Sequence, residues 1–152
     1  MSVIRRAGPA DEDDLVQMVR EFYEIDQHPF HLDRVLAGLR PLLTDDALGQ
    51  VWVIVDPEGV FVPAGYVVLA WGWSLESGGR EALLDEFFVR TRGQGLGTRA
   101  LIEVIDQATA AGVASIFLET EVHNRHAREF YGKAGFDLED SVWMSLRLHG
   151  DP

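Results

Sequence analysis

The sequence predicts a single domain of the mixed α/β class, extending over residues 1–152. A length of 152 residues is usual for one compact domain. Hydrophobic residues make up 47% and charged residues 25%, as in globular proteins with a buried core rather than in disordered chains. Segments with the two-residue period of strands interleave with segments of helical period. That order of elements predicts a packed α/β sandwich.

The first third of the chain is predicted to hold one strand and two helices. Residues 3–6 alternate as a short strand. Pro9 and the acidic residues 11–14 then mark a helix start, because acidic side chains suit the positive end of a helix dipole. Apolar residues at helical spacing extend this helix to Ile25, and a second helix is expected over residues 32–43.

The middle of the chain is predicted to form three strands. Residues 51–55 and 65–73 are rich in β-branched and aromatic residues and are separated by turn residues, so we expect them to pair as an antiparallel hairpin. Gly78 and Gly79 mark a turn into a third strand over residues 81–89.

The last third of the chain is predicted to alternate helices with strands. Apolar spacing indicates an amphipathic helix over residues 96–110, and residues 116–118 have the composition of a buried strand. Asn124 is expected to cap a further helix that ends at Gly135, because these residue types favour the two ends of a helix. The alternating residues 142–148 are expected to form a final strand.

The charge of the chain is strongly negative but unevenly placed. Lys and Arg number 13 against 25 Asp and Glu, a formal net charge of −12. This balance argues against nucleic acid or an anionic membrane surface as a partner. Arg90, Arg92 and Arg99 nevertheless lie within ten residues without an intervening acid. This local positive charge would attract an anion.

Composition also excludes several kinds of site and location. The chain has no cysteine, which excludes a cysteine nucleophile and thiolate metal ligands and favours an intracellular location. No apolar run reaches the roughly 18 residues of a membrane span, and residues 1–10 lack the apolar core of a signal peptide. We therefore expect a cytoplasmic protein without a membrane partner.

No metal site is expected. His123, His126 and Glu129 have a spacing that could place three ligands on one helical face. Arg125 and Arg128 flank them and would repel a cation.

The most informative segment is the glycine-rich stretch RGQGLGT at residues 92–98. It lies between the strand that ends at Val89 and the helix that begins near Leu96. Glycines let the backbone approach a ligand closely, and the first amides of a helix have no partner within it, so such a turn can bind phosphate. A dinucleotide fingerprint would need glycine at Thr98, and a nucleotide P-loop would need lysine after the last glycine. The spacing fits neither.

The chain resembles the GNAT superfamily of N-acetyltransferases in two motifs. Its signature R/Q-x-x-G-x-G/A is matched by Arg92, Gly95 and Gly97. The stretch NRHAREFYGKAGF at residues 124–136 is similar to the family's second motif, N-x-x-A-x-x-(F/L)-Y-x-x-x-G-F. The resemblance implies a GNAT-like fold: a mostly antiparallel central sheet of about six to seven strands, flanked by about four helices, with a splayed parallel strand pair.

The resemblance also implies that the chain binds acetyl-CoA as cosubstrate. The diphosphate would lie on the amides of residues 94–98, and pantetheine would lie where the strands at Phe88 and Ile116 splay apart. Asn124 would serve the cofactor arm, and Arg128 and Lys133 would neutralise the 3′-phosphate. The cofactor-binding residues expected from this resemblance are Phe87, Phe88, Val89, Arg92, Gln94, Gly95, Leu96, Gly97, Thr98, Asn124, Arg128 and Lys133.

Transfer of acetyl to an amine requires a proton acceptor. An amine with a pKa of about 10.4 is neutral in only about one molecule in 2,500 at pH 7, which corresponds to about 4.6 kcal/mol of barrier. Asp85 and Glu86 are adjacent on a predicted strand, and since side chains alternate, only one is expected to face the substrate. Similarity to the spermidine/spermine acetyltransferases in the stretch LDEFFV favours Asp85, but both stay candidates. Tyr131 is the residue that the family motif implies as the acid for the departing thiolate.

The favoured interpretation is an acetyltransferase acting on the primary amine of a small cationic molecule by direct attack. The absence of cysteine excludes a thioester intermediate on the protein. The alternative is a catalytically silent acyl-CoA-binding or interaction module with the same fold. The sequence leaves open the acceptor amine, and whether the chain forms a homodimer.

Overall fold

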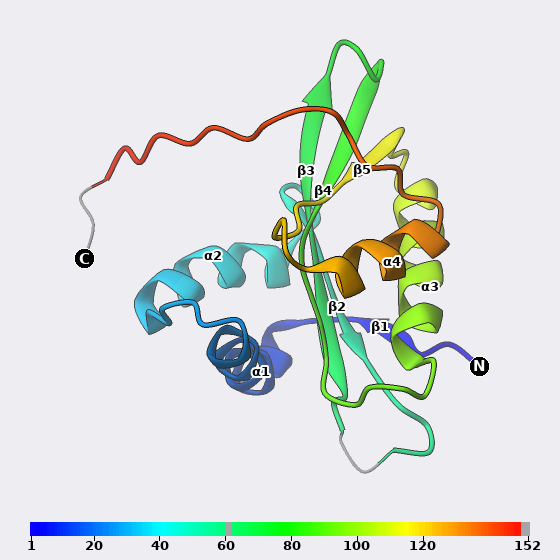
Figure 1. Cartoon of the computed structure of the whole chain (residues 1–152). Coiled ribbons are helices and arrows are strands. Elements are labelled where there is room, and N and C mark those ends of the chain that lie inside the picture. Colours follow the sequence, from blue (N-terminus) through cyan, green and yellow to red (C-terminus); the bar gives the residue numbers. More distant parts are fainter. Residues whose placement is uncertain (60–61, 150–152) are drawn as a thin grey trace. The chain divides into compact units, whose positions relative to one another are not determined.

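The structure is a computed structural model that describes residues 1–59 and 62–149. The chain forms two compact units, Met1–Glu119 and Thr120–Pro152. Unit 1 holds the sheet and the first three α-helices, and unit 2 holds the last helix and the segment that follows it (Figure 1).

Unit 1 is built on one sheet in which the spatial order of the strands is their order in the chain. The strands are β1 (Ile4–Arg6), β2 (Gly49–Ile54), β3 (Gly65–Ser74), β4 (Gly79–Val89) and β5 (Ser115–Phe117). Neighbours from β1 to β4 pair antiparallel, as predicted for the central hairpin. Strand β5 follows β4 in the chain after α3 and pairs with it in parallel. This pairing involves only Glu81 to Leu83 of β4. Beyond Leu83, β4 continues to Val89 without a ladder partner in β5.

Helices cover both faces of this sheet. A short 3-10 turn η1 (Pro9–Asp11) leads into α1 (Glu12–Ile25), which is followed by α2 (Leu32–Thr44). Figure 1 shows α1 and α2 on one side of the sheet and α3 (Leu96–Ala110) on the other. The predicted helices are confirmed with small shifts at their ends, because their apolar spacing and terminal residues are local signals.

The main core lies between the sheet and the first two helices. Leu15 and Met18 of α1 are fully buried there against the strand residues Val51 and Tyr66. Helix α3 buries a second apolar stripe, which includes Leu101 and Val104. Burying side chains of this size contributes about 1.5–3 kcal/mol each, so the two faces together hold the strands in register.

Unit 2 contains α4 (Arg125–Lys133). The predicted cap is confirmed, because the side chain of Asn124 accepts a hydrogen bond from the amide of Ala127 at 3.0 Å. Gly135 follows the helix with φ of 104°, a left-handed conformation that glycine adopts without strain.

The prediction of a final strand over residues 142–148 was wrong. This segment has no ladder partner among the described residues, and the sheet there has five strands instead of six to seven. Its alternating apolar side chains, such as Val142, Met144 and Leu146, are more than four-fifths exposed. Two-residue alternation specifies an extended backbone and a possible buried face, but a strand also needs a neighbour that supplies hydrogen bonds.

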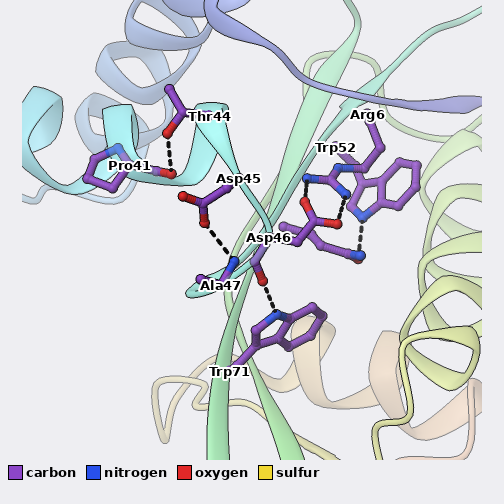
Figure 2. A network of polar contacts seen from close by, with 9 residues as sticks. Arg6, Pro41, Thr44, Asp45, Asp46, Ala47, Trp52 and Trp71 are labelled. Atoms are coloured by element: carbon purple, nitrogen blue, oxygen red, sulfur yellow. Dashed lines mark hydrogen bonds and ion pairs between the residues drawn. The ribbon is translucent and has the colours of Figure 1, made fainter.

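A polar network holds the connection between α2 and β2 against the sheet (Figure 2). The guanidinium of Arg6 donates to both carboxylate oxygens of Asp46, at 3.1 and 2.5 Å, and lies 5.3 Å from the ring centroid of Trp52. The indole nitrogen of Trp71 donates to the carbonyl of Asp46 at 2.8 Å. These bonds tie β1 and β3 to one turn, and the pKa of Asp46 is lowered by its hydrogen bond from Arg6.

A second ion pair ties the end of β4 to α1. Arg90 donates to both oxygens of Glu21, at 3.0 and 2.7 Å, and to the carbonyl of Pro63 at 2.8 Å. The side chains are 17% and 32% exposed, so the pair is better shielded from water than an ordinary surface ion pair. The bidentate hydrogen bond from Arg90 lowers the pKa of Glu21.

We predict that Glu21→Gln destabilises the protein by about 1–2 kcal/mol at pH 7, because Arg90 would lose its counter-ion in a partly buried place. Since folding lowers the pKa of Glu21, this contribution is present above the unfolded pKa and is lost as the pH falls through the folded pKa. Urea unfolding should therefore show a difference between parent and variant that shrinks below about pH 4. Glu24→Gln on the exposed face of the same helix is the control; an equal loss there would contradict the assigned role of Arg90.

Candidate active site

The antiparallel ladder between β3 and β4 contains an irregularity at Asp85. Val68 pairs with Glu86, whereas the next residue, Leu69, pairs with Leu84. Asp85 is thus the extra residue of a β-bulge, a feature that redirects side chains and interrupts strand pairing. Side chains therefore do not alternate strictly at this point. The expectation that only one of Asp85 and Glu86 faces the substrate depended on that alternation.

Glu86 lies between two tyrosines. Its Oε2 accepts a hydrogen bond from the hydroxyl of Tyr23 on α1 at 2.5 Å, and its Oε1 accepts one from the hydroxyl of Tyr66 on β3 at 2.7 Å. Burial raises the pKa of Glu86, and it outweighs the two hydrogen bonds that favour the carboxylate. The pKa values of both phenols are raised by burial and by the negative charge of Glu86, so both hydroxyls keep their protons and act as donors.

Asp85 has a different environment from its neighbour. Its side chain is accessible to solvent, and it has no hydrogen-bond partner among residues 1–59 and 62–149. The surrounding protein still desolvates its carboxyl and raises its pKa. Its negative charge acts on Tyr23, Tyr66 and Glu86, so the two carboxyls belong to one electrostatic cluster. Asp85 is thus the more exposed of the two carboxyls, and its oxygens accept no hydrogen bond from the described residues.

The glycine-rich loop leads from β4 into α3. Gly93 and Gly95 have φ of 81° and 76°, in the left-handed region that favours glycine, and Gly95 is the N-cap of α3. No side chain caps this helix end, and its first turn contains no acidic residue. Leu96 is buried and anchors the turn, whereas Arg92, Gln94 and Thr98 are exposed.

The arrangement fits a phosphate group. The first amides of α3 have no partner in the helix, and the helix dipole favours negative charge at this end. A Cβ atom added at Gly93 or Gly95 would meet no atom within 4 Å, so the backbone of the loop is open to close approach. A phosphate group can therefore approach the backbone of the loop without displacing a side chain.

One of the three arginines near the loop has its positive charge balanced by an acid that is distant in the sequence. Arg90 is engaged by Glu21 and by the carbonyl of Pro63, and Arg99 donates to the carbonyl of Met1 at 3.2 Å. Arg92 is the exposed arginine within the loop itself. Counting charges along the chain could not reveal that Arg90 is paired, because Glu21 is 69 residues away in the sequence.

The last three residues of β4 have distinct surroundings. The ring of Phe88 is buried in the main core and stacks on Phe22 with ring centroids 5.5 Å apart. Phe87 and Val89 are partly buried and pair with Val67 and Gly65 of β3. Strand β5 pairs with β4 only as far as Leu83. These three residues lie beyond that point, on an edge of β4 that β5 does not cover, and a ligand could reach them there.

The candidate residues of unit 2 surround α4. Asn124 caps the helix, and Arg128 donates to the carbonyls of Glu121 and Val122 in the preceding turn. Lys133 is exposed in the last turn. Tyr131 packs edge-on against Phe130 and Phe136, with ring centroids 5.1 and 5.7 Å away, and burial raises its pKa to about 12. Tyr131 therefore carries its proton at neutral pH.

Sequence reasoning missed Tyr23 and Tyr66 as site residues. Tyr23 fits the apolar stripe of α1, and Tyr66 fits the alternation of β3, so neither pattern distinguishes them from core residues. The available signal was the pair of tyrosines itself, because a buried phenol needs a hydrogen-bond partner.

Residues 1–59 and 62–149 contain neither a cluster of metal ligands nor a helix suited to a bilayer. No three His, Asp or Glu side chains there are grouped so that they could hold a metal ion. None of the helices there is both long enough and apolar enough to cross a bilayer.

Known proteins resemble this chain over nearly its whole length. It is 29% identical over 148 residues to an uncharacterized N-acetyltransferase, YhfO, of Bacillus subtilis (strain 168), with 96% of each chain covered. It is 27% identical over 165 residues to the thialysine N-epsilon-acetyltransferase of Mus musculus, covering 97% of this chain and 92% of that one. An integron cassette protein from the metagenome of Cole Harbour Salt Marsh superposes with a TM-score of 0.84 at 30% identity, covering 98% of this chain and 92% of that one.

The model of the acetyltransferase (GNAT) family matches residues 13–136, which contain the carboxylate pair, the glycine-rich loop and α4. This match, the relatives that are themselves N-acetyltransferases and the phosphate-compatible loop agree with one another. The chain belongs to the GNAT acetyltransferase family and is an acetyl-CoA-dependent N-acetyltransferase.

Proposed function

We propose that the protein transfers acetyl from acetyl-CoA to the primary amine of a small cationic molecule, with Asp85 or Glu86 supplying the base and Tyr131 the acid. The observation that supports this most strongly is the solvent-accessible carboxyl of Asp85 at the β-bulge, on the strand that leads into the phosphate-compatible loop. Two carboxyl groups next to each other also favour a positively charged acceptor.

In the proposed reaction the amine first loses a proton to the carboxylate or to a water molecule bound to it. The amine nitrogen then attacks the carbonyl carbon of the acetyl group, so that a C–N bond forms and the C–S bond breaks. The departing sulfur takes the electron pair of the C–S bond, and the Tyr131 hydroxyl gives it a proton. The nitrogen, which still carries one proton more than the amide product, then gives that proton to the Tyr131 oxygen and restores the hydroxyl. The products are the acetylated amine and coenzyme A, and the proton held by the carboxylate returns to solvent.

The surroundings of the two carboxyls favour Asp85 as the base. Both oxygens of Glu86 already accept hydrogen bonds, whereas Asp85 is accessible and has no hydrogen-bond partner among the described residues. Its raised pKa makes it a stronger base than an ordinary carboxylate. Glu86 would then bind the positive charge of the acceptor.

The cosubstrate would be held by residues of the glycine-rich loop and of the β4 edge. The amides of residues 94–98 would bind the diphosphate, and Arg92 would add positive charge beside them. The backbone of residues 87–89 would pair with the pantetheine arm as an added strand does. Asn124, Arg128 and Lys133 would serve the remainder of the cofactor.

We predict that Arg92→Ala weakens CoA binding about five- to tenfold, equivalent to about 1–1.4 kcal/mol, because one charge-assisted contact to phosphate is lost. Isothermal titration calorimetry at fixed ionic strength measures this directly. Arg34→Ala, at an exposed position on α2, makes the same change in net charge and should leave the Kd unchanged. Equal weakening by both variants would show that Arg92 acts only through the overall charge.

We predict that Asp85→Asn lowers kcat about 100-fold or more at neutral pH and abolishes the acidic limb of the pH–rate profile, because the proton acceptor is removed. Since the pKa of Asp85 is raised, the acidic limb of the parent should lie above the range of an ordinary aspartate. Glu86→Gln should instead raise KM for the amine more than it lowers kcat. The reverse result would exchange the two roles, and parental profiles in both variants would exclude both carboxyls.

We predict that Tyr131→Phe lowers kcat about 100-fold while the Kd for acetyl-CoA stays within about twofold, because only the proton donor is lost. Turnover is measured as amine-dependent release of CoA, and affinity by calorimetry. An unchanged kcat would remove Tyr131 from the mechanism.

A further inference from the structure

Two tyrosines from different elements converge on one carboxylate in unit 1. Tyr23 lies near the end of α1 and donates to one oxygen of Glu86, while Tyr66 lies on β3 and donates to the other. The two hydrogen bonds, at 2.5 and 2.7 Å, place one phenol on each oxygen of Glu86. Tyr66 is 1% exposed, so at least one donor is fixed by the core.

The two donors fix Glu86 without using all its acceptor capacity. A carboxylate has about four lone-pair positions, of which the two phenols occupy one on each oxygen. One lone pair on each oxygen can still accept a hydrogen bond from an ammonium group. A cation that donates to both would be bound in one orientation, because the phenols prevent rotation of the carboxylate.

The rings of the two tyrosines are themselves held in place. Phe22 packs edge-on against Tyr66 with ring centroids 6.4 Å apart. Tyr23 contacts the ring of Phe30 in the connection between α1 and α2, with ring centroids 6.2 Å apart, and its carbonyl accepts a bond from the amide of His28 at 2.8 Å. The position of the Tyr23 hydroxyl therefore depends on this connection as well as on α1.

We propose that Tyr23 and Tyr66 are positioning residues that act through Glu86, fixing its carboxylate so that it binds and orients the ammonium group of the acceptor. This inference rests on the proposed function, and it adds two residues that do not belong to the glycine-rich loop or to the motif at residues 124–136. We assign neither tyrosine a role in proton transfer, because burial and the charge of Glu86 raise the pKa of both phenols.

The charged and titratable groups around Glu86 determine what its titration reports. They are Tyr23 of α1, Tyr66 of β3, Asp85 of β4 and His28 of the connection between α1 and α2. The two phenols and His28 favour the ionised form, whereas burial and Asp85 favour the protonated form. Removing one of the two hydroxyls should therefore raise the pKa of Glu86, because a hydrogen bond that favours the ionised form is lost.

The direct test follows the titration of Glu86 by NMR in protein labelled with carbon-13 at the glutamate carboxyls, assigned through Glu86→Gln. In Tyr23→Phe the midpoint should move up by about one pH unit, the effect of losing one hydrogen bond to a charged group. Tyr66→Phe should move it in the same direction, and it serves as the second variant if Tyr23→Phe does not fold. Tyr131→Phe removes a phenol in unit 2 and should leave the midpoint unchanged. An unmoved midpoint in both Tyr23→Phe and Tyr66→Phe would overturn the proposal.

Kinetics provide the second measurement. Tyr23→Phe should raise KM for the amine about tenfold while KM for acetyl-CoA stays unchanged, and it should have no further effect in a Glu86→Gln background, because the tyrosine acts through that carboxylate. A full additional effect in that background would contradict the inference. The NMR titration needs no turnover, so it can show the expected shifts of the Glu86 midpoint even if the parent protein releases no CoA with any amine. In that case the proposed function fails and the placement of Glu86 stands.

Discussion

The site depends on the register between β3 and β4. These two strands pair over nearly their whole length, and their register shifts between Val68 and Leu69, opposite Asp85. Because the extra residue is accommodated there, Glu86 stays opposite Val68 on the face covered by α1, where it meets Tyr23 and Tyr66. A one-residue slip would move Glu86 to the other face and remove both hydrogen bonds. The same strand then continues to Arg90, whose ion pair with Glu21 ties its end to α1 before the loop begins.

In the proposed reaction, this register would place the carboxyls that meet the acceptor on the strand that leads to the cosubstrate loop. The carboxyls lie on β4. The glycine-rich loop follows β4, and the amides that suit a diphosphate lie at the start of the next helix, α3. The buried Leu96 and Ala100 anchor the start of α3 to unit 1, so the loop has a rigid element on each side. Groups held by packed elements lose little conformational entropy when a substrate binds. The free-energy cost of holding both substrates in one orientation is therefore lower.

The sequence predicted well what depends on neighbouring residues and poorly what depends on distant ones. The helices, the hairpin and the Asn124 cap follow from spacing and terminal residues, and all three are confirmed. The strand expected at residues 142–148 failed because alternation cannot supply a pairing partner. The partners of Glu86 are 63 and 20 residues away in the sequence, and the bulge at Asp85 depends on the opposite strand. The carboxylates could therefore be named from the sequence, but their different surroundings could not.

The most direct test of the account is an NMR titration of nitrogen-15-labelled protein with CoA and, in parallel, with pantetheine, which lacks the diphosphate. If the amides that open α3 hold the diphosphate, the resonances of residues 94–98 should shift with CoA and stay in place with pantetheine. Saturable binding of CoA that leaves these resonances unmoved would contradict the account, because the diphosphate would then lie elsewhere on the protein.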